Sequence, residues 1–136
     1  MNSLCVCGSK KPAIQCCERF LDGAQQAKTP EQLMRSRYSA YALGGYGEYL
    51  LRTWFPATAR NLTVIELSKR SCEWIKLEVL NKSQSGDEGM VEFKAHFRDK
   101  NGEPAIQHEK SIFTRNGGRW FYVGGGVESS SLCSEG

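Results

Sequence analysis

The sequence lacks the features that mark membrane, secreted and nucleic-acid-binding proteins. No apolar run approaches the roughly 18 residues that a membrane-spanning helix needs. The N-terminus has no charged region followed by an apolar stretch and a small-residue cleavage site, so it does not resemble a secretory signal peptide. No run of lysine and arginine exceeds two residues, and the net charge is only +3. We therefore expect a cytoplasmic protein that does not contact a membrane, and we expect no nucleic-acid partner unless folding assembles a basic patch.

The motifs of several enzyme classes are also missing. The sequence contains no nucleophile elbow, no phosphate-binding loop and no pair of catalytic carboxylates. Its hydrophobic content of 40% is nevertheless that of a globular protein, and 136 residues suffice for one domain with a small appendage. These observations favour a folded, non-catalytic protein.

Cysteine, in contrast, is concentrated at one end of the chain. Four of the six cysteines lie within the first 17 residues, as C-x-C, eight residues, then C-C: Cys5, Cys7, Cys16 and Cys17. A segment this short has no core of its own, and a reducing compartment disfavours disulfides, so the clustered thiolates predict a metal site. Zinc takes four tetrahedral ligands in structural sites, which leaves no open position for water. We predict one structural Zn²⁺ per chain; reactive thiols, disulfides and an iron–sulfur cluster are the alternatives.

The other two cysteines stand apart from this cluster. Cys72 precedes a predicted strand and is expected to be a small buried apolar residue. Cys133 lies in a tail rich in glycine and serine and has no visible partner.

The first strong helix signal begins at Thr29. Thr29 suits the N-cap position, Pro30 occupies the first helical position, and Gln32 completes a capping box. The glycine pair at 44–45 ends the helix.

An inward-facing stripe runs along this predicted helix. Arg37 falls inside it, and a buried arginine needs a partner or a ligand, so Arg37 is a candidate site residue. The other members of the stripe are Met34, Tyr38, Tyr41 and Ala42.

Shorter helices are predicted at 47–55 and 64–67, after which the hydrophobic period changes to two. The first alternating segment places Ile75, Leu77 and Val79 on one face. Strands are predicted at 75–79, 91–98, 105–115 and 119–123, joined by short turns, with a frayed tail after residue 123. Helices followed by a meander of strands predict an α+β fold in which the helices cover one face of an antiparallel sheet.

Two sequence resemblances extend these predictions. The segment C-V-C-G-S-K-K-P-A-I-Q-C-C resembles the SEC-C zinc motif, except that Lys10 stands where the motif commonly has a second glycine. The segments L-M-R-S-R-Y-S-A-Y, H-E-K-S-x-F and R-W-F-Y-V resemble the YchJ-like family of bacterial proteins. That resemblance implies a nuclear transport factor 2-like cone, in which three helices pack on a curved antiparallel sheet. The implied organisation is a SEC-C-like zinc knuckle at 1–22, the cone domain at 28–126 and a flexible tail at 127–136.

A cone fold has a mouth between helices and sheet where ligands enter. The predicted lining is polar and aromatic: Arg37, Tyr38, Tyr41, Trp54, His108, Glu109 and Trp120, with Arg35, His96 and Arg98 as further candidates. The plain structural alternatives are a buried ion pair of Arg37 with Glu109, aromatic residues that serve only the core, and a solvated basic face around His96. His108 and Glu109 are neighbours on one strand, so they point to opposite faces and cannot act directly on each other.

The function that we predict is zinc binding without catalysis. The knuckle is expected to contact an unknown protein partner, and the cone domain to bind a partner or a small-molecule ligand. An enzyme acting on a small molecule in the cone pocket, with Arg37, His108 or Glu109 taking part, is the alternative. A third hypothesis is a nucleic-acid contact through Lys10, Lys11 and Arg19 together with the basic strand face.

Overall fold

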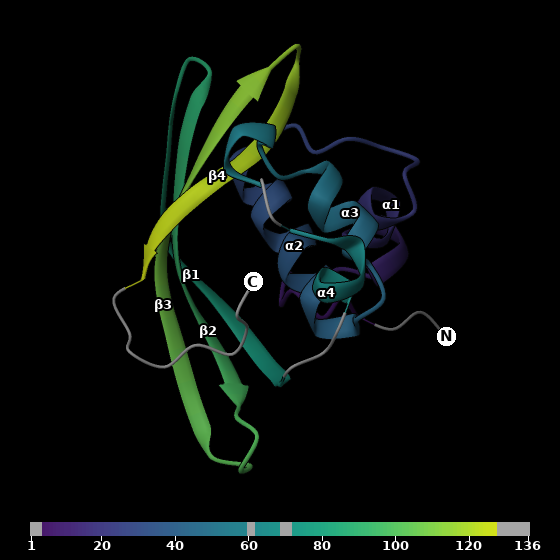
Figure 1. The fold of residues 1–136 in the computed structure, drawn as a ribbon, viewed down its shortest axis with the longest axis vertical. Helices are drawn as coiled ribbons and strands as arrows, with labels where there is room; N and C mark the ends of the chain where they lie inside the picture. The colour runs from purple at the N-terminus through teal and green to yellow at the C-terminus, as the bar shows by residue number, and fades with distance from the viewer. Residues whose placement is uncertain (1–3, 60–61, 69–71, 128–136) are drawn as a thin grey trace.

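Four antiparallel strands form a single sheet in the order β1-β2-β3-β4, and the helices lie against one face of it (Figure 1). The computed structural model describes residues 4–59, 62–68 and 72–127. The helical elements are η1 (Ala13–Gln15), α1 (Glu18–Leu21), α2 (Pro30–Leu43), α3 (Gly47–Arg52), η2 (Pro56–Thr58) and α4 (Val64–Ser68). The strands are β1 (Glu73–Ser85), β2 (Glu88–Arg98), β3 (Pro104–Asn116) and β4 (Arg119–Val127). The α+β prediction is confirmed, because a curved meander carries the three predicted helices on one side.

Helix α2 begins as its sequence predicts. Thr29 is extended, and its hydroxyl oxygen accepts a hydrogen bond of 3.1 Å from the backbone N–H of Gln32. The Gln32 side chain accepts in return from the backbone N–H of Lys28 at 2.7 Å. The chain leaves the helix at Gly44, whose φ of 75° suits glycine.

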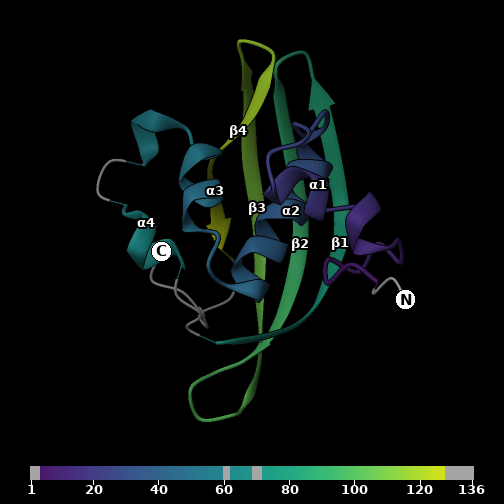
Figure 2. The same ribbon diagram turned by 90° about the vertical axis from the view of Figure 1, so that its right-hand side faces the viewer.

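The burial of α2 is wider than the predicted stripe. Besides Met34 and Tyr38, the helix buries Leu33 and Ala40, which lie on its other side. Ala40 packs in a second cluster of buried side chains with Phe20 and Leu21 of α1, Tyr49 and Leu50 of α3, and Leu67 of α4. Helix α2 is therefore enclosed between the sheet and the other helices, as Figure 2 shows.

Helix α3 ends at Arg52, three residues before the predicted end at 55. The segment after it pairs with β4: the Tyr122 N–H donates to the Thr53 carbonyl at 2.8 Å, and the Phe55 N–H donates to the Tyr122 carbonyl at 2.8 Å. The chain leaves the helix because these backbone groups find partners on the sheet.

In strand β1 the side chains that face the core are not all those that the sequence predicts. Its pairing with β2 shifts register between Trp74 and Lys76, and this irregularity reverses the alternation there. Leu77 is buried as predicted, but Ile75 is 47% exposed, and Trp74 packs against the core in its place. The prediction for Ile75 was therefore wrong.

Strand β4 is longer than predicted. The residues at 124–127, expected to belong to the tail, pair with 109–112 of β3. Residues 128–136, including Cys133, lie outside the described part of the chain. Cys72 is half-buried and takes part in a disulfide, so it is not the small buried thiol that the sequence suggested.

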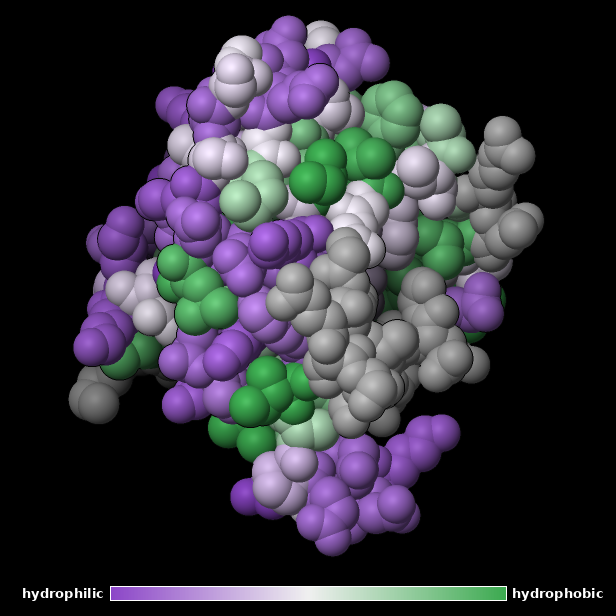
Figure 3. Space-filling view, turned by 90° about the vertical axis from the view of Figure 1, so that its left-hand side faces the viewer, coloured by the Kyte–Doolittle hydropathy of each residue, from purple (hydrophilic) through white to green (hydrophobic). Residues whose placement is uncertain are grey.

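The outer face of the sheet is largely hydrophilic, with scattered apolar side chains (Figure 3). His96 lies 2.5 Å from Glu78, and His108 lies 2.7 Å from Glu92, each pair joining neighbouring strands. The predicted basic face is therefore interleaved with carboxylates. None of the helices in the described ranges is long and apolar enough to cross a membrane.

Candidate metal centre and ligand cavity

The four N-terminal cysteines converge as the spacing predicts. Their Sγ atoms all lie within 4.8 Å of one another, and all four residues are buried. Cys7 Sγ is 3.6 Å from Cys16 Sγ, which is 3.9 Å from Cys17 Sγ. Four thiolates around one Zn²⁺ at about 2.3 Å would be separated by about 3.8 Å, so the donor set fits a single tetrahedral metal ion.

Two residues with positive φ shape the turn between the cysteine pairs. Gly8 has φ of 82° and Lys10 has φ of 68°, and Lys10 is the one non-glycine residue with positive φ among the described residues. Around this turn the Cys5 N–H donates to the Lys11 carbonyl at 2.8 Å. The motif position that commonly carries a second glycine is therefore one whose backbone favours glycine.

The cysteine segment is part of the main core. Its four cysteines belong to the same cluster of buried residues as Leu33, Tyr38 and Leu77. Helix α2 supports the thiols directly, because Ser39 Oγ lies 3.8 Å from Cys5 Sγ. The knuckle thus lies beside α2 and near β1, where Gly8 approaches the Leu77 carbonyl, and it shares their apolar contacts (Figure 2).

Arg35 also anchors the knuckle. The sequence placed it among the further candidates for the ligand pocket, but its Nη1 donates to the Cys7 carbonyl at 2.8 Å and its Nε to Glu31 at 2.9 Å. The spacing of Glu31 and Arg35, four residues apart on one helix, is a signal for this local ion pair. Its link to the knuckle had no signal in the sequence.

The electrostatics of the cluster favour a bound cation. In the thiol form, the hydrogen bonds from Cys5 and Cys7, followed by burial, raise the pKa of the Cys17 thiol. Several thiolates cannot share so small a buried volume without a compensating positive charge. A divalent metal ion supplies that charge and holds such ligands deprotonated.

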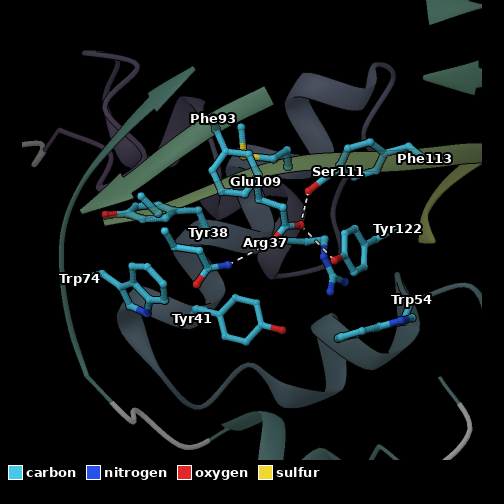
Figure 4. A pocket seen from close by; sticks show the side chains of 13 residues that line it. Arg37, Tyr38, Tyr41, Trp54, Trp74, Phe93, Glu109, Ser111, Phe113 and Tyr122 are labelled. Atoms are coloured by element: carbon cyan, nitrogen blue, oxygen red, sulfur yellow. Dashed lines mark hydrogen bonds between the residues drawn. The ribbon is translucent and has the colours of Figure 1, made fainter. Parts of the chain in front are cut away.

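A separate cavity of about 240 Å³ lies between α2 and the inner face of the sheet (Figure 4). Five of the predicted pocket residues line it, namely Arg37, Tyr38, Tyr41, Trp54 and Glu109. The rest of its wall is mainly apolar or aromatic and was not predicted: Met34, Trp74, Phe93, Ala95, Gln107, Ser111, Phe113 and Tyr122.

Arg37 is 5% exposed, and the C-terminal end of α3 holds its guanidinium. Nη1 donates to the Leu50 carbonyl at 2.8 Å and to Thr53 Oγ1 at 2.7 Å. Carbonyls in the last turn of a helix lack intrahelical partners and carry the negative end of its dipole, so they attract a cation. The guanidinium also stacks on aromatic rings, with its carbon 4.8 Å from the centre of Trp54 and 4.6 Å from that of Tyr122.

Glu109 is 6% exposed, and its carboxylate is held by hydroxyl and amide donors. Gln107 Nε2 donates to one oxygen at 3.0 Å, while the hydroxyls of Ser111 and Tyr122 donate to the other. Within the described residues no ion pair joins Glu109 to Arg37, so the predicted pairing was wrong. The physical reason is that each group has closer partners on its own side of the cavity.

Burial affects the phenols in the cavity. It raises the pKa of Tyr41, which the nearby Arg37 guanidinium partly opposes. Burial also raises the pKa of Tyr122, and the charge of Glu109 adds to that rise. Both hydroxyls therefore stay protonated at neutral pH and can donate hydrogen bonds.

Two predicted pocket residues lie elsewhere, which corrects the sequence prediction. His108 is on the outer face of the sheet, opposite to Glu109, as strand alternation requires. Trp120 is buried, but its indole N–H donates to the Lys28 carbonyl at 3.2 Å, away from the cavity. His96 and Arg98 are also outside the cavity lining.

Comparison with known proteins agrees with this architecture. Residues 29–125 match the family model described as YchJ, middle NTF2-like domain. The chain belongs to the YchJ family. A UPF0225 protein of Chromobacterium violaceum is 43% identical over 128 residues, which cover 91% of this chain and 93% of that protein. A UPF0225 protein of Serratia proteamaculans is 40% identical over 131 residues, which cover 92% of this chain and 84% of that protein.

A solved structure shares the fold over most of the chain. The solution structure of a SEC-C motif containing protein from Rhodopseudomonas palustris superposes on this one with a TM-score of 0.85. The two sequences are 36% identical, and the match covers 93% of this chain and 100% of that chain. The predicted family and fold class are confirmed. The clustered cysteines and this SEC-C relative together indicate metal binding.

Proposed function

We propose that this protein is a zinc-stabilised domain that binds a small molecule in the cavity between α2 and the sheet, without catalysing a reaction. The observation that carries the proposal is the cavity of about 240 Å³, in which aromatic walls surround the buried side chains of Arg37 and Glu109. Concave, mainly apolar sites with a few convergent polar groups are the usual form of small-molecule sites.

The metal in this proposal is zinc, held by the four thiolates. The Sγ separations suit a tetrahedral zinc site, and the resemblance of this segment to the SEC-C zinc motif, which the Rhodopseudomonas palustris relative also contains, supports the choice of zinc. Four protein ligands fill the coordination sphere, so the metal stabilises the fold and has no open position for substrate.

The arrangement of the cavity supports binding over catalysis. The Glu109 carboxylate accepts three hydrogen bonds from protein groups, which occupy most of its roughly four acceptor positions. His108, the other acid–base candidate, faces away from the cavity. The lining therefore contains no free histidine, cysteine or carboxylate to activate a bound molecule.

Metal analysis tests the first half of the proposal. Purified protein should contain one zinc per chain by elemental mass spectrometry, and Cys16→Ser should lose most of it. Protein that contains no zinc and keeps an ordered N-terminal segment by NMR would refute the structural role of the metal.

Ligand screening by NMR tests the second half. Of the three tryptophans, Trp54 and Trp74 line the cavity and Trp120 does not. A small molecule in the cavity should shift the indole N–H signals of Trp54 and Trp74 and leave that of Trp120 unchanged. If a broad set of small molecules leaves the first two signals in place, the cavity does not bind ligands.

Protein binding through the knuckle is a second candidate function, favoured by exposed apolar side chains. Leu4 is 62% exposed, Ile14 is 59% exposed and Val6 is 43% exposed, although all belong to a segment whose cysteines are buried. A protein that co-purifies with the wild type should be lost with a Leu4→Ser, Ile14→Ser variant that retains its zinc. Retention of the same protein by that variant would refute this function.

A further inference from the structure

We infer that the ligand of the cavity is a small planar carboxylate, held through its oxygens by Arg37 and Tyr41 and through its ring by the aromatic wall. This inference rests on the proposed small-molecule function and names the class of ligand. The cavity volume of about 240 Å³ lies below the roughly 300–1,000 Å³ of sites for drug-sized ligands, so a molecule with one or two rings fits it.

The unused donors of Arg37 point to an anionic group. Arg37 has five N–H donors: those on Nη1 bind Leu50 and Thr53, and the guanidinium also interacts with the Tyr41 hydroxyl, which leaves Nε and Nη2 without an acceptor of full strength. Among the described residues, Trp54 Nε1 is the one fully buried polar side-chain atom without a hydrogen-bond partner. The Nε and Nη2 groups of Arg37 therefore remain accessible from the cavity, although the residue as a whole is 5% exposed.

Tyr41 adds a donor on the same side. Figure 4 shows its hydroxyl directed toward the space next to the Arg37 guanidinium. The raised pKa of Tyr41 keeps the phenol protonated, as a donor to a bound oxygen. The fork of a guanidinium matches a carboxylate, and bonds of this charged kind are roughly twice as strong as neutral ones.

The other charged group of the cavity does not favour a cation. The Glu109 oxygens are directed to Gln107, Ser111 and Tyr122, so they offer little to an ammonium ligand. The Arg37 guanidinium stacks on the rings of Trp54 and Tyr122, so those aromatic faces are not open to a cationic ligand. The charged hydrogen-bonding groups left in the cavity are therefore mainly the donors of Arg37, while the acceptor left on the wall is chiefly the side-chain oxygen of Gln107.

The ring of the ligand would lie against the remaining aromatic wall. Trp74 and Tyr38 line the end of the cavity away from Trp54, and Tyr38 and Trp74 contact each other edge to face at 5.7 Å. A flat ring gains contact area with such a wall and costs little conformational entropy on binding.

The experiment titrates zinc-loaded protein with three probes of one size, namely benzoate, benzamide and benzylamine, and follows the indole N–H signals by NMR. Benzoate should bind with a dissociation constant on the order of 0.1–1 mM and shift the Trp54 and Trp74 signals. Benzamide should bind about tenfold more weakly, and benzylamine should leave the spectrum unchanged. Equal or tighter binding of benzamide or benzylamine would overturn the anionic class while leaving the cavity a ligand site.

Variants locate the binding groups. Tyr41→Phe removes one hydroxyl from the cavity and should weaken benzoate about three- to tenfold. Tyr46→Phe, outside the cavity, is the matched control and should change nothing. Arg37→Met should abolish binding, and Tyr41→Phe keeps the test valid if Arg37→Met does not fold. An unchanged benzoate affinity in Tyr41→Phe would refute the proposed orientation. If no probe shifts the Trp54 and Trp74 signals, the carboxylate class is refuted; the proposed function fails as well only if the broad ligand screen also leaves both signals in place.

Discussion

The backbone conformation of Lys10 leads to a prediction about stability. A glycine substitution should raise the free energy of unfolding at Lys10 and lower it at the next residue, Lys11. Lys10 has φ of 68°, and this left-handed conformation costs a non-glycine residue about 1–2 kcal/mol. Glycine removes that cost, but its greater conformational entropy in the unfolded chain lowers the free energy of unfolding by about 0.4–1 kcal/mol. Lys10→Gly should therefore raise the free energy of unfolding by about 0.5–1 kcal/mol.

Lys11 is the matched control for this substitution. It is exposed like Lys10 and carries the same charge, but its φ is not positive. Lys11→Gly therefore gains nothing from relief of strain and should lower the free energy of unfolding by about 0.4–1 kcal/mol. The two variants should differ by about 1–2 kcal/mol, which corresponds to roughly 3–8 °C in the midpoint of thermal unfolding.

The assay is thermal and urea unfolding of both variants and the wild type at one fixed free zinc concentration, because metal binding itself shifts apparent stability. The change should appear in the unfolding of the whole domain, since the four cysteines share a core with Leu33, Tyr38 and Leu77. Equal losses in both variants would refute the assignment of strain to Lys10. A change confined to zinc release, with no change in domain unfolding, would show that the knuckle unfolds separately.

Two further predictions concern the ion pair at α2 and the packing beside the cavity. The hydrogen bond from Lys82, followed by Arg35, lowers the pKa of Glu31, so its stabilising effect is present above the unfolded-state value and is lost as the pH falls through the lower, folded-state value. Glu31→Gln should cost about 0.5 kcal/mol at pH 7, discounted for solvent screening. The difference from the wild type in urea unfolding should shrink once the pH falls below the ordinary glutamate pKa of about 4.3 and vanish only below the lower, folded-state pKa. A difference that stays constant with pH would contradict this. Gly125→Ala would place a Cβ atom 2.6 Å from Glu109 Oε2 and 2.7 Å from a backbone oxygen, so it should cost about 1–3 kcal/mol and shift the Trp54 indole signal. Gly124→Ala is the control, because nothing lies within 4 Å of its added Cβ, and equal losses in the two variants would refute the packing argument.

The role of Arg37 changes how the cavity is understood. A buried arginine on the inner face of a helix suggests a carboxylate partner on the sheet, and Glu109 is available there. The guanidinium instead binds the Leu50 carbonyl and Thr53 at the end of α3, which joins two helices. Because the ion pair does not form, one donor face of Arg37 stays open to the cavity.

The sequence by itself determined the features that depend on nearby residues. The capping box around Thr29, the alternation of β2 and the convergence of the four cysteine thiols were all predicted correctly. Each rests on local hydrogen bonds, on the two-residue period of a strand, or on the reach of thiolates separated by one short turn. Such interactions need no knowledge of the rest of the chain.

Only the tertiary structure decided the features that depend on contacts between distant segments. The register shift in β1 brings the side chain of Trp74, and not that of Ile75, to the inner face of the sheet. Pairing with β3 makes residues 124–127, predicted to be tail, part of strand β4. The partners of Arg37 lie 13 and 16 residues away, at the C-terminal end of another helix. Such choices depend on which backbone groups remain unpaired after the elements pack, and that competition is settled across the whole domain.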